Sequence, residues 1–130
     1  MSTTQSTVAG EFVDAILALD FARATALLDE AIDFRAMTPN RIWEADGPAG
    51  VERVLREWFD DPDEEVTSMV AVEPGAVIGD TERVGWLGHG TRAEGPFVVE
   101  QQAYLRERDG RIRWLRVICS GMRPPAAARD

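Results

Sequence analysis

The chain has 130 residues, of which 45% are hydrophobic and 28% are charged, and its formal net charge at pH 7 is -9. This length suits one domain with one core, and the composition is that of an ordinary globular protein, which excludes a disordered or membrane-spanning chain. The negative field repels phosphate backbones and anionic lipid heads, so we expect neither nucleic acid nor a membrane as a partner.

Cysteine usage and the terminal segments indicate the compartment and the boundaries of the fold. The single cysteine, Cys119, excludes an intrachain disulfide, and the first residues lack the basic stretch and apolar core of a signal peptide. Both observations favour a cytoplasmic protein. We expect a disordered N-terminus at residues 1–7, a single domain at residues 8–122 and a loose tail at residues 123–130.

Two helices are predicted at the start of the domain. Residues 8–19 repeat apolar side chains at helical spacing, and Ser6 or Thr7 is placed to cap the first amides. Asp20 is placed to cap a second, shorter helix, which we expect to run from residue 22 to about residue 29 or 30.

A strand pair and a third helix follow. Residues 31–38 alternate apolar and polar side chains until Pro39, which predicts a strand, and residues 41–45 predict a short return strand. Asp46-Gly47-Pro48 combines a capping carboxylate with a proline of the first turn, and the apolar stripe at residues 51–59 predicts the third helix.

An acidic connector separates this helix from the rest of the sheet. Residues 60–65 carry several carboxylates around a proline, and nothing fixes them as a cage, so a solvated loop is favoured over a metal site. Residues 66–73 and 83–91 then predict two strands, joined by a turn at Pro74-Gly75 and a longer loop near Gly79-Asp80.

The last hairpin is the clearest local signal. Residues 97–108 and 111–120 predict two long strands joined by Asp109-Gly110, the preferred pair for a two-residue turn with positive φ. One-to-one pairing outward from the turn predicts one face with Val99, Gln101, Ala103, Leu105, Ile112, Trp114, Arg116, Ile118 and Ser120. The opposite face carries Glu100, Gln102, Tyr104, Leu115, Val117 and Cys119. The first face is the more apolar, so we predict that it lies under the helices, while a second copy of the chain could cover the other.

The common catalytic and cofactor motifs are missing from this sequence. Residues 85–90 match no phosphate-binding fingerprint, Ser120 lacks the glycine pattern of a nucleophile elbow, and one His with one Cys cannot build the usual zinc cage. We therefore expect no cofactor and no metal. His89 is the only histidine and hence the default general base, with a structural role as the alternative.

Polar residues within the last strands supply the remaining candidates. Glu100, Tyr104 and Arg116 cannot be buried without partners, so each is paired, exposed or functional. Arg116, next to Gln101 on the predicted inner face, could orient a polar ligand group. The candidate catalytic residues are His89, Glu100 and Tyr104, and the candidate ligand-binding residues are Gln101, Arg116, Ser120, Trp114, Ile118 and Trp43.

The order of elements and three local motifs resemble the nuclear transport factor 2-like superfamily, including its SnoaL-like and ketosteroid isomerase-like members. The motifs are Phe34-Arg35-Ala36-Met37-Thr38-Pro39, Gly47-Pro48-Ala49-Gly50-Val51, and Val99-Glu100-Gln101-Gln102-Ala103-Tyr104 with Asp109-Gly110-Arg111-Ile112. The resemblance implies an α+β, cystatin-like cone, with N-terminal helices packed on a curved, mostly antiparallel sheet. Members include ketosteroid isomerases, polyketide cyclases, limonene epoxide hydrolases and non-catalytic binding or dimerisation modules.

The chain departs from those enzymes at three positions. The resemblance implies carboxylates where this chain has Thr38, Val99 and Ser120. Threonine cannot serve as the base, although a bulge in the sheet could turn Glu100 inward.

Three functions are consistent with the sequence. The leading hypothesis is a homodimer, associated through the sheet, that binds a small apolar molecule in a conical pocket. The second is an isomerase, cyclase or hydrolase acting on a polyketide- or terpenoid-like substrate, with His89 or Glu100 as base and Tyr104 or Arg116 stabilising oxyanion charge. The third is a non-catalytic dimerisation module.

Overall fold

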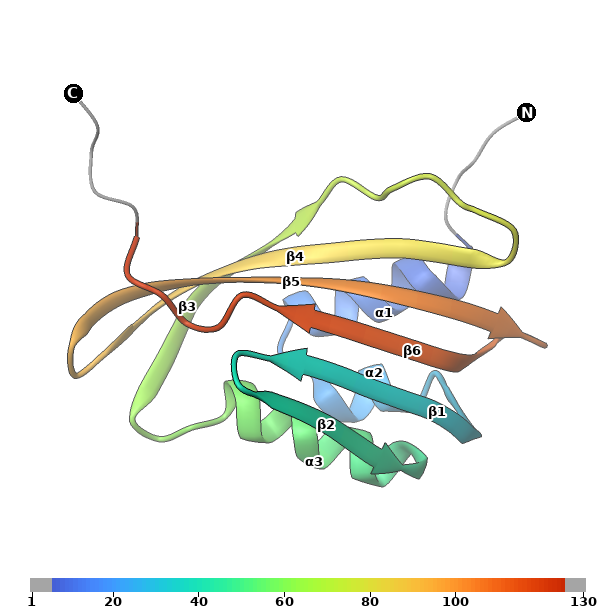
Figure 1. Cartoon of the computed structure of the whole chain (residues 1–130), viewed down its shortest axis with the longest axis horizontal. Helices are drawn as coiled ribbons and strands as arrows, with labels where there is room; N and C mark the ends of the chain where they lie inside the picture. The colour runs from blue at the N-terminus through green and yellow to red at the C-terminus, as the bar shows by residue number, and fades with distance from the viewer. Residues whose placement is uncertain (1–5, 126–130) are drawn as a thin grey trace.

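A computed structural model describes residues 6–125 as two layers, with helices on one face of a sheet (Figure 1). In chain order the elements are α1 (Thr7–Leu17), α2 (Phe21–Thr25), β1 (Leu28–Thr38), β2 (Arg41–Asp46), α3 (Gly47–Phe59), β3 (Glu64–Val72), β4 (Thr81–Arg92), β5 (Gly95–Arg108) and β6 (Arg111–Cys119). Within the described residues, no helix is both long and apolar enough to cross a membrane.

The six strands form one sheet in the order β2-β1-β6-β5-β4-β3. Every neighbouring pair is antiparallel except β1 and β6, which run parallel and place the N-terminal strand pair beside the last hairpin. Figure 1 shows the three helices behind the sheet, with α3 beside β1 and β2. The expected α+β cone, helices on a mostly antiparallel sheet, is confirmed.

The start of α1 is held by a capping arrangement that joins residues distant in sequence. The Ser6 side chain accepts a hydrogen bond from the Ala9 backbone N at 3.3 Å, and the Ser6 backbone N donates to Oε1 of Glu82 at 2.7 Å. A local capping box uses a Glu three residues into the helix, whereas here the carboxylate comes from β4. Ser6 and Thr7, expected in the N-terminal tail, therefore belong to the folded domain, and residues 1–5 lie outside the described part.

The prediction for the second helix was wrong at its end, because α2 stops at Thr25 and β1 begins at Leu28. The Ile112 backbone N donates to the Leu27 carbonyl oxygen at 2.9 Å, and Leu28 is buried opposite Ile112. Leu27 and Leu28 therefore pair with β6 and do not continue the helix. Tertiary burial here outweighs the local helical pattern of alanines and leucines.

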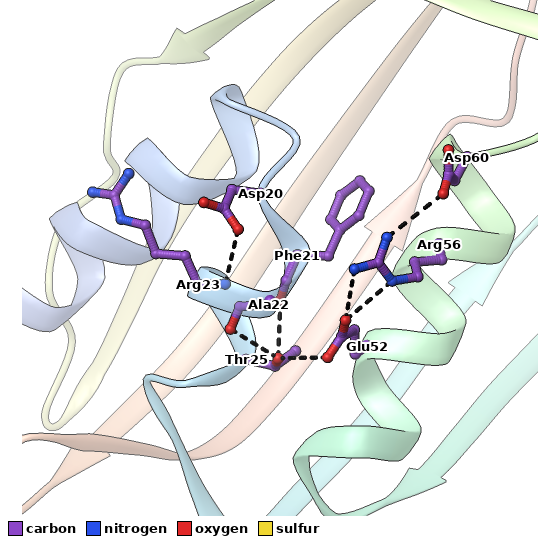
Figure 2. Close-up of polar contacts among 8 residues, drawn as sticks. All are labelled: Asp20, Phe21, Ala22, Arg23, Thr25, Glu52, Arg56 and Asp60. Carbon is purple, nitrogen blue, oxygen red and sulfur yellow. Dashed lines mark hydrogen bonds and ion pairs between the residues drawn. The ribbon is translucent and has the colours of Figure 1, made fainter.

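A polar network joins α2 to α3 (Figure 2). The Thr25 hydroxyl donates to the Phe21 carbonyl oxygen at 2.9 Å and lies 3.4 Å from Oε1 of Glu52. Arg56 pairs with Glu52 at 2.7 Å and with Asp60 at 3.6 Å. The pKa of Arg56 is raised, mainly because its side chain donates hydrogen bonds to Glu52. The network orients the short helix on the longer one.

The last hairpin has the predicted turn but not the predicted register. Asp109 and Gly110 both have positive φ, 55° and 79°, as expected. A bulge between Arg106 and Glu107 then shifts the pairing by one residue, so that Leu105 lies opposite Leu115, Ala103 opposite Val117 and Gln101 opposite Cys119.

The bulge reverses the face on which the side chains of β6 lie. Leu115 and Val117 are buried under the helices, whereas Trp114, Arg116 and Ile118 lie on the outer face, contrary to the prediction. Burying the Arg116 guanidinium without a partner would cost far more free energy than one irregular pair between strands. The shifted register is therefore favoured.

The C-terminal boundary also differs from the expected one. Arg123, expected in the loose tail, exchanges two backbone hydrogen bonds with Val98, at 2.7 and 2.9 Å. The ordered chain thus continues past residue 122, and residues 126–130 of the expected tail lie outside the described part.

Candidate functional site

The inner face of the sheet, which the helices cover, is almost entirely apolar. Apart from Glu82, which caps α1, the buried polar side chain of the sheet among the described residues is Gln101, which is 1% exposed. Oε1 of Gln101 accepts a hydrogen bond from Nε1 of Trp86 at 2.9 Å. Because an indole nitrogen only donates, this bond fixes the orientation of the amide. Of the predicted ligand-binding residues, Gln101 is the one that the structure buries completely.

A cluster of aromatic rings lines the cone between α3 and the β1–β2 pair. Trp58 of α3 lies 6.5 Å from Phe34, 5.8 Å from Trp43 and 6.3 Å from Phe59, measured between ring centroids. Trp58 is 8% exposed. Its Nε1 is buried and has no hydrogen-bond partner within the described part of the chain. In the sequence, Trp58 belongs to the apolar stripe at residues 51–59, and no sequence signal marks an indole as unpaired.

Trp43 covers this cluster from the short strand β2. Its Nε1 donates to Oγ1 of Thr38 at 2.8 Å, and the Arg41 guanidinium lies 3.4 Å from the centre of its ring. Thr38 occupies the position at which the family resemblance implies a base, and here its hydroxyl holds a tryptophan. Trp43, a predicted ligand-binding residue, thus lies on the helix-covered side of the sheet.

Further apolar side chains that are only partly buried pack against the core. They are Leu17, Leu19, Leu27, Ala45, Val66, Met69, Cys119 and Met122. Cys119 is the last residue of β6, and Met69 pairs with Gly88 near the end of β4. These side chains therefore lie at the end of the sheet where β1 and β6 stop. This end of the cone is therefore its less covered end.

The three candidate catalytic residues lie on the outer face of the sheet. His89 is exposed and opposite Val98, Glu100 is opposite Leu87, and Tyr104 lies between Arg83 and Arg116. These positions are in different cross-strand rows, so the structure does not bring the three groups together in the cone.

Most of the predicted ligand-binding residues are also outside the cone. Arg116 pairs with Asp33 at 3.1 Å and stacks over Trp114, with 4.6 Å between the guanidinium carbon and the ring centre. Ser120 is exposed just past β6, and its Oγ accepts a hydrogen bond from the Glu100 backbone N at 2.9 Å. Ile118 is exposed on the same face. Of the predicted site, Gln101 and Trp43 remain on the inner side.

The outer face instead carries an open apolar groove across β2, β1 and β6. Its centre is formed by Ile42, Met37 and Ile118, which are 67%, 53% and 50% exposed. The groove has a volume of about 360 Å³, and Arg35 and Glu44 lie on its border. A second hollow of about 630 Å³ shares the same three apolar residues. Contiguous exposed apolar surface of this kind is typical of an interaction surface.

The acidic connector ends at Glu64, which is the first residue of β3. No group of three His, Cys, Asp or Glu residues within residues 6–125 is arranged to hold a metal ion. Burial, with a smaller contribution from the charge of Asp61, raises the pKa of the Glu64 carboxyl despite Arg92 at 3.8 Å. Folding therefore disfavours the charged form of this carboxyl.

Comparison with known proteins finds likeness in structure alone, since no family model and no curated protein matches the chain. A protein with a ketosteroid isomerase-like fold from Catenulispora acidiphila, solved with trimethylamine, is 14% identical with a TM-score of 0.69, covering 91% of this chain and 88% of that one. An NTF2-like protein from Cytophaga hutchinsonii is 14% identical with a TM-score of 0.65, covering 89% and 99%.

An epoxide hydrolase from M. tuberculosis, described as LEH-like, is 15% identical with a TM-score of 0.61, covering 87% of this chain and 80% of the other. Identities this low show the fold and carry no activity across, because one fold hosts many functions. The topology, the covered sheet and these neighbours agree, and the chain has the nuclear transport factor 2-like, ketosteroid isomerase-like fold.

Proposed function

We propose that this protein binds a small, largely apolar molecule inside the cone, between α3 and the inner face of the sheet. The observation that carries the proposal is the inner wall itself, which is aromatic and aliphatic with the amide of Gln101 as its polar group. Small-molecule sites typically combine such walls with a few polar groups. The half-buried, free Cys119 fits a reducing cytoplasm, where we propose that the protein works.

The described conformation is closed around this wall. Trp86, Gln101 and Leu105 expose almost no surface, which leaves no room for a water molecule against them. A ligand must therefore displace side chains at the less covered end of the cone, where apolar residues are only partly buried.

Indole NMR signals test the proposal directly, because three tryptophans lie on the inner side and Trp114 lies outside. The ¹⁵N-labelled protein is titrated with acetophenone, a small apolar ketone, and each indole signal is assigned from a Trp→Phe variant. We expect saturable shifts at Trp43, Trp58 or Trp86, with Trp114 unchanged. The proposal is rejected if no signal shifts saturably, or if only Trp114 shifts.

Acid–base catalysis at His89 and Glu100 is a weaker candidate, since both side chains lie on the outer face. The variant combining His89→Ala and Glu100→Gln should bind acetophenone as the wild type does. A loss of binding in this variant, with the fold intact by circular dichroism, would favour the enzymatic hypothesis over ours.

Self-association through the outer face is a second candidate function, favoured by the exposed groove around Met37, Ile42 and Ile118. We expect the wild type to sediment as a homodimer and the Met37→Asp, Ile118→Asp variant as a monomer, because the two substitutions remove the apolar contact surface and association would have to desolvate two carboxylates. Ile78→Asp is the matched control, since Ile78 is exposed away from this groove. A monomeric wild type would exclude this function.

A further inference from the structure

The indole nitrogen of Trp58 is an exception in the cone. The other inner indoles donate to protein acceptors, Trp86 to Gln101 at 2.9 Å and Trp43 to Thr38 at 2.8 Å. Nε1 of Trp58 is buried without an acceptor among the described residues. Buried donors in native proteins are nearly always paired, so an unpaired one needs an explanation.

The aromatic rings around Trp58 do not supply the missing acceptor. Its neighbours in the cluster are the rings of Phe34, Trp43 and Phe59, and an aromatic face is at best a weak acceptor. A buried water needs two to four polar partners, which these rings do not offer. An apolar molecule with one acceptor fits better, because the rings contact its body while the N–H pairs with its oxygen.

The ring of Trp43 covers Trp58 from a strand at the edge of the sheet. Trp43 packs edge-on against Trp58, with an angle of 88° between the rings. It is held by the Thr38 hydrogen bond and by the exposed Arg41 guanidinium. Its strand, β2, is at the sheet edge and pairs with β1 alone. Displacement of the Trp43 ring therefore breaks these two polar contacts and its edge-on packing against Trp58, while the other strands of the sheet keep their pairing.

We infer that Trp58 is the ligand-anchoring donor of the cone and that Trp43 is the cover that moves to admit the ligand. The ligand class is a small, largely apolar molecule with a single hydrogen-bond acceptor, such as a ketone, ether or ester. This inference rests on the proposed function, which it extends by naming the polar contact and the route of entry.

A pair of probes of equal shape isolates the hydrogen bond. Acetophenone and α-methylstyrene differ in one group, a carbonyl in the first and a C=CH₂ in the second. In Trp58→Phe the aromatic wall remains and the donor is lost. We expect the Kd of acetophenone to rise about five- to tenfold, the usual effect of one hydrogen bond, while the Kd of α-methylstyrene changes less than twofold. Trp114→Phe, on the outer face, should change neither.

A second measurement needs no variant that could fail to fold. In the wild type, acetophenone should move the Trp58 indole proton downfield, as a hydrogen bond does, and α-methylstyrene should not. If both probes bind but Trp58→Phe weakens them equally, or both give the same indole shift, Trp58 is only a wall and the inference is overturned. If neither probe shifts an inner indole, the proposed function fails and this inference fails with it.

Thr38→Val tests the cover. The valine keeps the shape of threonine but removes the acceptor that holds Trp43, so displacement of the Trp43 ring should cost less free energy. Both probes should then bind about two- to fivefold more tightly. Equal or weaker binding of both would show that Trp43 is a fixed part of the wall.

Discussion

Replacing Trp58 by phenylalanine should leave stability nearly unchanged, although the side chain is 8% exposed and belongs to the core. The smaller ring costs about 1–2 kcal/mol in lost burial and residual cavity. Removal of a buried donor that has no acceptor returns about 1–3 kcal/mol. The two effects nearly cancel, so the free energy of unfolding should change by about 1 kcal/mol or less.

Trp86→Phe is the matched control, since it makes the same change of ring at a satisfied indole. Here the ring loss adds to the loss of the 2.9 Å bond, and the Gln101 carbonyl oxygen is left buried without its donor, for a total of about 3–4 kcal/mol. Urea unfolding followed by far-UV circular dichroism resolves the difference, which corresponds to a midpoint shift of about 2 M. Equal losses in the two variants would mean that the Trp58 N–H has an acceptor in solution, and the argument from its lack of a partner would be refuted.

Three further predictions concern the fold. Burial raises the pKa of Glu64, so the protonated form is favoured by folding, and this contribution is lost as the pH rises through the folded-state pKa. Glu64→Gln should therefore raise the urea midpoint at pH 7, and this gain should disappear below the ordinary pKa of glutamate. A gain that is constant at all pH values would contradict the prediction. Glu65→Gln, at the exposed neighbouring residue, is the control. Glu82→Ala should destabilise the protein by about 1–2 kcal/mol, because it removes the acceptor for the Ser6 backbone N. Glu82→Gln should destabilise it less, because the amide oxygen still accepts this hydrogen bond. Equal losses in the two variants would show that the side chain acts through packing and not through the cap. Gly110→Ala should cost about 1–2 kcal/mol in thermal or urea unfolding through its φ of 79° alone, since an added Cβ meets no atom within 4 Å, and an unchanged stability would exclude the left-handed turn.

Local patterns predicted most of the elements of this fold. The stripe of apolar residues at 51–59 became α3, and Asp109-Gly110 became the turn of the last hairpin. These signals depend on near neighbours in the chain, since helical periodicity, proline placement and turn residues act within a few positions. The family resemblance, carried by motifs in the same segments, led to the correct cone.

The candidate site was much less predictable, because it depends on which face each strand presents. One bulge in the last hairpin turned Trp114, Arg116 and Ile118 outward, and no sequence pattern in the hairpin predicts this bulge. The bulge exists because the alternative register would bury a guanidinium, which is a property of the assembled sheet. Trp43 and Gln101, predicted for the site, stayed on the inner side.

The sequence by itself thus determined the helices, the strands, the tight turn and the absence of familiar catalytic motifs. The tertiary structure decided where α2 ends, which carboxylate caps α1 and which indole is left without a partner. The physical reason is distance along the chain. Glu82 and Ser6 are 76 residues apart, and the rings packed around Trp58 come from two other elements, β1 and β2, as well as from its own helix.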